Sequence, residues 1–149
     1  MYEIENDGID HINIYSKGKT KLGKLLSNFA YTPFTGNGLL FNSVEGWYYW
    51  YITGKKHDYL TKLFGYNAKL EGRKYERLYT ITEDILLKVY ISKVEQNKNI
   101  KEMILCNNLP YTHYYIFGNK KVETDNEWMG ILWNEVKEYI LSKEGSFNE

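Results

Sequence analysis

The sequence predicts an α+β fold dominated by helices, in a single domain over residues 1–149 with a small β element near the N-terminus. Strand-like alternation and a turn signal lie in the first third of the chain, whereas helical spacing of apolar residues takes over from Ser43 onward. A length of 149 residues is ordinary for one domain and is long enough to build a core.

The β element is predicted to be a strand followed by a hairpin. Residues 12–15 alternate between apolar and polar side chains, which indicates a short strand. In residues 34–41 a Gly-Asn-Gly turn separates two apolar ends, which indicates a hairpin. Between them lies a basic segment that we expect to be a mobile, solvated loop, or else a local basic patch. Its lysines are Lys17, Lys19, Lys21 and Lys24.

The first helix begins after Ser43, because a serine hydroxyl can accept hydrogen bonds from the free N–H groups two or three positions on. The aromatic residues 47–51 are too apolar for a solvated face, so most of this helix should be buried. A second helix is expected over residues 58–64, with its stop at Gly65.

Three more helices are expected in the second half. Thr80 and Glu83 have the spacing of a capping box, so a helix should run from there to about Gln96. Asn99 is expected to cap a short helix, and the last helix follows residues 125–126. We expect residues 1–10 and 142–149 to be frayed. The apolar face of the last helix comprises Trp128, Leu132, Val136, Tyr139 and Ile140.

Composition narrows the class of protein. The 19 Lys and Arg balance 19 Asp and Glu, so no global positive field would draw in nucleic acid, and such a partner must meet a local patch. A single cysteine, Cys106, rules out an internal disulfide, and three histidines argue against a Cys/His zinc site. We therefore expect no metal. The acidic N-terminus has no apolar core, and no apolar run approaches the roughly 20 residues that span a membrane, so a cytoplasmic protein is predicted.

One acid stands out as a candidate catalytic group. Glu45 follows the predicted cap Ser43 and lies in the first turn of the aromatic helix, where the helix dipole favours a carboxylate. Desolvation by aromatic neighbours would raise its pKa. An isolated Ser-x-Glu also fits an acid that merely satisfies its own helix end. Asn28 is the natural partner, since its amide can orient a sugar hydroxyl or a leaving base, although a turn residue bonded to its own backbone fits as well.

These residues belong to a longer pattern. The Ser-Asn-Phe at 27–29 and the Ser-x-Glu at 43–45 resemble the NADAR family, also called YbiA-like, whose members are N-glycosidases associated with NAD and ADP-ribose. The matching segments cover nearly the whole chain in the family's order. They are residues 12–16, 26–30, 33–34, 43–45, 63–65, 94–101 and 126–130.

The resemblance implies a set of site residues and no cofactor. Glu45 and Asn28 would be catalytic, with Glu45 supplying charge stabilisation or proton transfer. Substrate contacts would come from Ser27, Phe29, Ser43, Trp47, Tyr48, Gly118 and Asn126. Basic residues near the helix, namely Lys55, Lys56 and Arg73, are candidates for phosphate contacts.

The chain also departs from the family pattern. Where the family reads Glu-His-Tyr-Phe-Gln-Ala-x-Lys, this chain keeps the Glu at position 45 and lacks the His, Gln and Lys. The family's Trp-Gly loop before the last helix is represented by Phe117-Gly118.

Three hypotheses for the function follow. The first is an N-glycosidase that removes ADP-ribose from guanine in nucleic acid, a repair reaction that would suit a bacteriophage facing an ADP-ribosylating toxin. The second is an N-glycosidase acting on phosphoribosylated intermediates of the riboflavin pathway. The third, prompted by the missing His, Gln and Lys, is a lapsed enzyme that binds ADP-ribose, nucleic acid or a protein without turnover. The oligomeric state has no signal in the sequence.

Overall fold

The computed structural model describes residues 2–123 and 125–147 and has the helix-dominated α+β fold that the sequence predicts. Six α-helices and three short two-stranded sheets occur among these residues. The chain packs into two compact units, one formed by Asn28–Lys98 and the other by the residues before and after that segment. The single domain expected over residues 1–149 stays a prediction, and the two units are described separately below.

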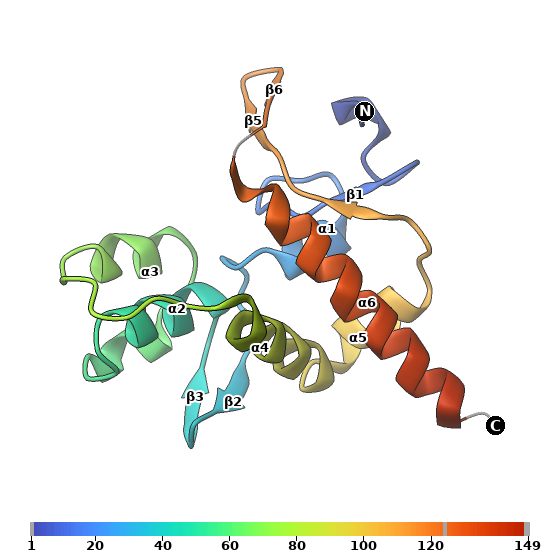
Figure 1. Ribbon diagram of the computed structural model, residues 1–149. Helices are drawn as coiled ribbons and strands as arrows, with labels where there is room; N and C mark the ends of the chain where they lie inside the picture. The colour runs from blue at the N-terminus through green and yellow to red at the C-terminus, as the bar shows by residue number, and fades with distance from the viewer. Residues whose placement is uncertain (1, 124, 148–149) are drawn as a thin grey trace. The chain divides into compact units, whose positions relative to one another are not determined.

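The unit formed by Asn28–Lys98 contains a hairpin followed by helices (Figure 1). Its elements are β2 (Phe34–Gly36), β3 (Leu39–Phe41), α2 (Val44–Ile52), the 3-10 helix η2 (Asp58–Lys62), α3 (Gly65–Gly72) and α4 (Glu83–Glu95). Helices α2 and α3 lie side by side, and α4 packs against β2 and α2. The core of this unit is made mainly by Phe34, Phe41, Val44, Trp47, Trp50, Leu60, Tyr90 and Val94.

The predicted hairpin is confirmed, and the backbone conformation of its turn explains why it forms. Asn37 and Gly38 have φ angles of 53° and 79°, the left-handed conformation that a two-residue hairpin turn requires. This turn sets the register, in which Phe34 pairs with Phe41 and the two rings stack at 5.5 Å between centroids. Both aromatic side chains are buried, so the hairpin is held to the core at its open end.

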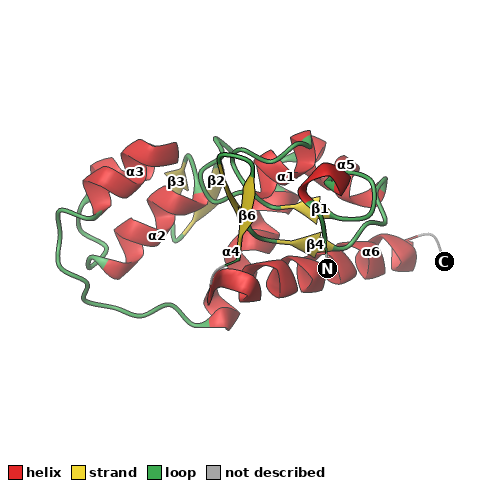
Figure 2. Cartoon of the chain, turned by 90° about the horizontal axis from the view of Figure 1, so that it is seen from above, coloured by secondary structure: helices red, strands yellow, loops and turns green. Residues whose placement is uncertain are grey.

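The other unit is built from both ends of the chain. Its elements are the 3-10 helix η1 (Ile4–Asn6), β1 (Ile12–Asn13), α1 (Lys21–Leu26), α5 (Lys98–Leu105), β4 (Tyr111–Thr112), β5 (Tyr115–Phe117), β6 (Lys120–Val122), the 3-10 helix η3 (Asp125–Glu127) and α6 (Trp128–Phe147). Strands β1 and β4 pair in parallel, with Ile12 opposite Tyr111, and α6 runs beside them (Figure 2).

Two predictions for the first half of the chain are wrong in part. The lysine-rich segment contains helix α1, in which the Thr20 hydroxyl accepts from the Gly23 N–H at 2.8 Å and Leu22 and Leu26 are buried. The segment predicted as a second helix is the 3-10 helix η2, and Gly65 begins α3 instead of ending a helix. Both α1 and α3 are too short to show a clear apolar stripe in the sequence.

The later helices agree with the sequence apart from their ends. Helix α4 is capped by Thr82, two residues after the predicted cap Thr80, and Thr82 Oγ1 accepts from the Ile85 N–H at 3.3 Å. Helix α5 begins at Lys98, so Asn99 lies inside it. The strands β4, β5 and β6 were not predicted from the sequence.

The two ends of the chain are more regular than predicted. Helix α6 continues to Phe147 where a frayed tail is predicted from residue 142, and Glu144 is tied to Lys101 of α5 by an ion pair of 3.4 Å. Residues 4–6 form η1, while residues 1, 148 and 149 lie outside the described part of the chain.

On α6 itself, Leu132, Val136 and Ile140 are buried as predicted, whereas Trp128 and Tyr139 are 37% and 44% exposed. Across the described residues, no helix combines the length and the apolar character needed to cross a membrane.

Candidate active site

Ser43 organises the start of α2, as the sequence predicts. Its hydroxyl accepts from the Gly46 N–H at 2.9 Å, which caps the helix, and donates to the Leu63 carbonyl at 2.8 Å. The side chain is fully buried. Ser43 therefore holds the segment around Leu63 against the first turn of α2, and its hydroxyl is engaged inside this unit.

Glu45 lies in that first turn, partly exposed to solvent. Its N–H donates to the Asn28 carbonyl at 2.9 Å, so the two predicted catalytic residues are joined through the backbone. Burial raises the pKa of the Glu45 carboxyl from 4.5 to about 7, although the positive charges of Lys69 and Arg73 act in the opposite direction. A carboxyl with a pKa near 7 exists in both forms at neutral pH and can accept or donate a proton.

The side chain of Asn28 is oriented by a residue that the sequence did not single out. Tyr90 of α4 donates its hydroxyl hydrogen to Asn28 Oδ1 at 3.0 Å. This bond assigns the oxygen end of the amide to Tyr90 and leaves the Nδ2 end to donate to a ligand. Asn28 is thus arranged to bind an acceptor, such as a hydroxyl oxygen of a sugar.

The cations near Glu45 come from α3 and the turn after it. The positive charges of Arg73, a predicted phosphate contact, and of Lys69 both lower the pKa of the Glu45 carboxyl. Sequence reasoning missed Lys69 because α3 was not predicted. Lys55 and Lys56 follow the opposite end of the nine-residue helix α2, about 13 Å along its axis. There the Lys55 ammonium lies 4.5 Å from the centre of the Tyr51 ring.

The predicted aromatic contacts divide between core and surface. Trp47 is 2% exposed and packs against Tyr51, so its ring belongs to the core of the unit. Tyr48 is half-buried, and the Arg77 guanidinium lies 5.8 Å from its ring centre. Phe29 is also half-buried, and its carbonyl accepts from the Gly65 N–H at 2.9 Å. Phe29 therefore links the Asn28 segment to the start of α3.

Three predicted substrate contacts belong to the other unit. Ser27 follows α1 and is buried. Gly118 forms the turn between β5 and β6 with a φ of 61°. Asn126 donates from Nδ2 to the Tyr115 hydroxyl at 3.4 Å. The structure thus joins Glu45, Asn28 and Arg73 within one unit and places Ser27, Gly118 and Asn126 in the other.

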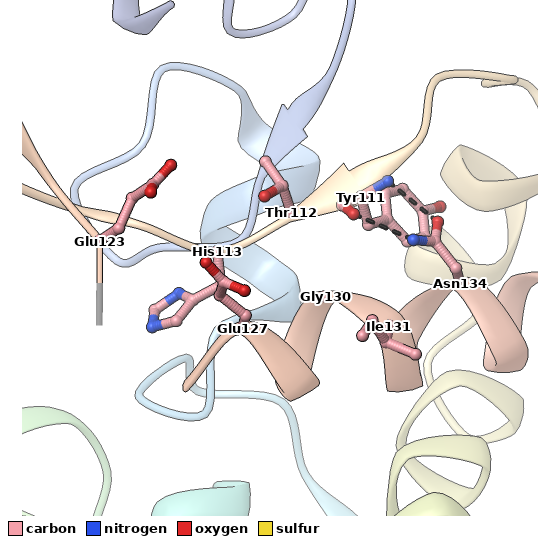
Figure 3. A pocket seen from close by; sticks show the side chains of 8 residues that line it. All are labelled: Tyr111, Thr112, His113, Glu123, Glu127, Gly130, Ile131 and Asn134. Carbon is pink, nitrogen blue, oxygen red and sulfur yellow. Dashed lines mark hydrogen bonds between the residues drawn. The ribbon is translucent and has the colours of Figure 1, made fainter. Parts of the chain in front are cut away.

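A pocket in that other unit lies between β4 and the start of α6 (Figure 3). The amide of Asn134 bonds the backbone of Tyr111 at both its N–H and its carbonyl, so this side chain serves the packing of α6 on β4. Within residues 2–123 and 125–147 no three His, Cys, Asp or Glu side chains are grouped so as to hold a metal ion. The pocket is lined by Tyr111, Thr112, His113, Glu123, Glu127, Gly130, Ile131 and Asn134.

Lys93 is a second titratable group that sequence reasoning missed. It lies on α4 one turn from Tyr90 and is fully buried, and this burial lowers the pKa of its ammonium from 10.5 to about 7. The sequence signal that could have indicated the burial of Lys93 was its position on the apolar stripe formed by Leu86, Tyr90 and Val94.

Fold and site together define a class: a small α+β protein in which a partly buried carboxyl at a helix start is joined to an oriented amide and lies near two cations. The solved structure of the E. coli protein YbiA has a similar fold, with a TM-score of 0.66 and 18% sequence identity over 96% of this chain and 95% of that one. This likeness shows the fold alone. No protein-family model matches the sequence, and the search of curated proteins found no match to it.

Proposed function

We propose that this chain is an N-glycosidase of the NADAR type that hydrolyses the bond between ADP-ribose and guanine in nucleic acid. The observation that carries the proposal is the Glu45 carboxyl at the start of α2, with its raised pKa, joined to Asn28 and flanked by Lys69 and Arg73. The fold similarity to YbiA and the sequence resemblance of residues 27–29 and 43–45 support the same reading.

The reaction needs one water molecule and one proton relay. Hydrolysis breaks the bond between the anomeric carbon of ribose and the exocyclic nitrogen of guanine, through a state in which positive charge develops on the ribose. A carboxylate at position 45 would stabilise that charge and take a proton from the attacking water. The same proton would then pass to the departing nitrogen, so free ADP-ribose is released, unmodified guanine remains in the polynucleotide, and Glu45 returns to its starting form.

The neighbouring groups have separate roles in this proposal. Nδ2 of Asn28 would donate to a ribose hydroxyl, because its Oδ1 already accepts from Tyr90. Lys69 and Arg73 would bind the pyrophosphate, which carries negative charge at neutral pH. No cofactor enters the reaction.

Incubation with an oligonucleotide that carries ADP-ribosylated guanine, followed by mass detection of free ADP-ribose, tests the proposal. We expect release by the natural chain and a loss of at least about 100-fold for Glu45→Gln. Glu76→Gln, which removes an exposed carboxylate outside the site, serves as the matched control. Full activity of Glu45→Gln would overturn the proposal.

Other outcomes separate the remaining hypotheses. Tight binding of the modified oligonucleotide with no release at any pH would indicate a lapsed enzyme that reads the modification. Absence of both binding and release would direct the search to phosphoribosylated riboflavin-pathway intermediates, for which the same variants apply.

A further inference from the structure

Two exposed aromatic side chains lie on chain segments that are hydrogen-bonded to the start of α2. Tyr31 is 57% exposed and Phe64 is 51% exposed, and their rings meet edge to face with 5.3 Å between centroids. Neither ring contributes to the core of its unit. Tyr66, at the start of α3, adds a third aromatic side chain that is 59% exposed. We call Tyr31 and Phe64 the aromatic pair.

Three hydrogen bonds connect the segments that carry the aromatic pair to each other and to the start of α2. The Asn28 carbonyl accepts from the Glu45 N–H at 2.9 Å, and the Phe29 carbonyl accepts from the Gly65 N–H at 2.9 Å. The Leu63 carbonyl accepts from the Ser43 hydroxyl at 2.8 Å. The segments that carry Tyr31 and Phe64 are therefore tied to each other and to the first turn of α2.

The charge of this unit favours a polyanion as the occupant. Residues 28–98 contain ten Lys and Arg against seven Asp and Glu, a surplus of three positive charges that the net charge of the whole chain conceals. Two of these cations, Lys69 and Arg73, lower the pKa of the Glu45 carboxyl through their positive charge. Aromatic side chains beside cations are the combination that binds single-stranded nucleic acid, because bases stack on the rings while phosphates meet the charges.

We propose that the aromatic pair stacks with the nucleobase next to the modified guanine, so that the site acts on a single-stranded polynucleotide in preference to a free nucleotide. This inference rests on the proposed function, and it goes further by naming the residues that select the substrate's size. A small metabolite with a single base would reach Glu45 and leave the aromatic pair unused.

Two substrates with the same modified guanine test the inference: a short single-stranded oligonucleotide and the ADP-ribosylated mononucleotide. We expect kcat/KM to be about tenfold or more higher for the oligonucleotide. Tyr31→Ala and Phe64→Ala should remove most of that advantage and leave the mononucleotide rate unchanged. Phe64→Tyr should retain the advantage. Tyr139→Ala removes a similarly exposed ring from α6 and is the control.

Binding supplies a readout that does not depend on turnover. Fluorescence anisotropy with an unmodified, labelled oligonucleotide should show about tenfold weaker binding by Tyr31→Ala and by Phe64→Ala than by Tyr139→Ala. Unchanged binding, or equal rates on both substrates, would overturn the inference. Weaker binding by the two variants with no cleavage by any protein would retain the aromatic pair as a nucleic-acid surface and reject the glycosidase. Circular dichroism verifies that each variant is folded.

Discussion

Among single side chains, Glu45 is one whose removal should stabilise the protein. The unfolded chain releases this proton near the ordinary value of 4.5, whereas the folded chain holds it to about pH 7. Stability therefore falls as pH rises from 4.5 to 7, because the folded state binds more protons over that range. After allowance for solvent screening, Glu45→Gln should raise the free energy of unfolding by about 1–2 kcal/mol near pH 8.

Urea unfolding at about pH 8 and about pH 4 measures this gain, which should be small at the lower pH. Glu76→Gln controls for the loss of one negative charge from the same unit. A variant of Glu45 that is less stable than the natural chain near pH 8 would mean that the carboxylate is held by donors and is not strained by burial.

Tyr90 is predicted to act through Asn28. Tyr90→Phe keeps the ring in the core and removes the hydroxyl that orients the Asn28 amide. We expect kcat on the modified oligonucleotide to fall about tenfold with little change in KM, because the bond orients a group that acts in the transition state. In an Asn28→Ala background, Tyr90→Phe should cause no further fall in kcat.

The side-chain amide protons of Asn28 give a second measurement in NMR spectra. Their chemical shifts should move in Tyr90→Phe, while backbone signals far from α4 stay in place. If Tyr90→Phe lowered kcat by the same factor in the natural chain and in Asn28→Ala, Tyr90 would instead have a role that does not depend on Asn28.

At the level of helices and turns, Gly46 is a position where the packing of α2 requires glycine. A Cβ at this position would lie 2.7 Å from the Leu60 carbonyl oxygen and 3.0 Å from that of Leu63. Helix α2 therefore packs directly on the backbone of η2, and a histidine at this position would require that backbone to move. Gly46→Ala should lower the free energy of unfolding by about 2 kcal/mol, because backbone atoms must move apart.

Gly36→Ala is the matched control for Gly46→Ala. A Cβ at Gly36 would meet only the Phe41 ring, at an ordinary distance of 3.9 Å, so this variant should be neutral or slightly more stable. Urea midpoints measured at one pH compare the two. Equal midpoints would show that η2 can move away from α2 without cost.

The elements that the sequence predicts are those with a local signal. Ser43 has the cap chemistry for α2, Asn37 and Gly38 have the turn chemistry for the hairpin, and the aromatic run of α2 could only be buried. Strands β1 and β4 are two residues each and pair across the chain, so no local pattern marks β4. The Asn28 to Glu45 bond needs tertiary packing and was found only in the structure, as was the role of Lys69.

The net charge of the whole chain is +0, but the two units carry opposite net charges. The surplus of three positive charges in residues 28–98 is matched by an equal negative surplus in the remaining residues. Oligonucleotide binding should therefore weaken with salt despite the neutral total. Two phosphate contacts predict a slope of about −1.4 for the logarithm of the binding constant against the logarithm of salt concentration.

Lys69→Gln and Arg73→Gln should each reduce that slope by about 0.7. Lys88→Gln, an equal change of charge at an exposed position on α4, is the control and should leave the slope unaltered. Anisotropy titrations at several salt concentrations give these slopes. A slope that changes equally in all three variants would assign the effect to overall charge.

The parallel pairing of β1 with β4 also sets an order of events during synthesis on the ribosome. Ile12 cannot meet Tyr111 until residue 111 has been made, whereas residues 28–98 form a continuous segment with its own core. Domains generally fold as units during translation, starting from the N-terminal side. The segment with Glu45 should therefore fold on the nascent chain while strand β1 is not yet paired with β4.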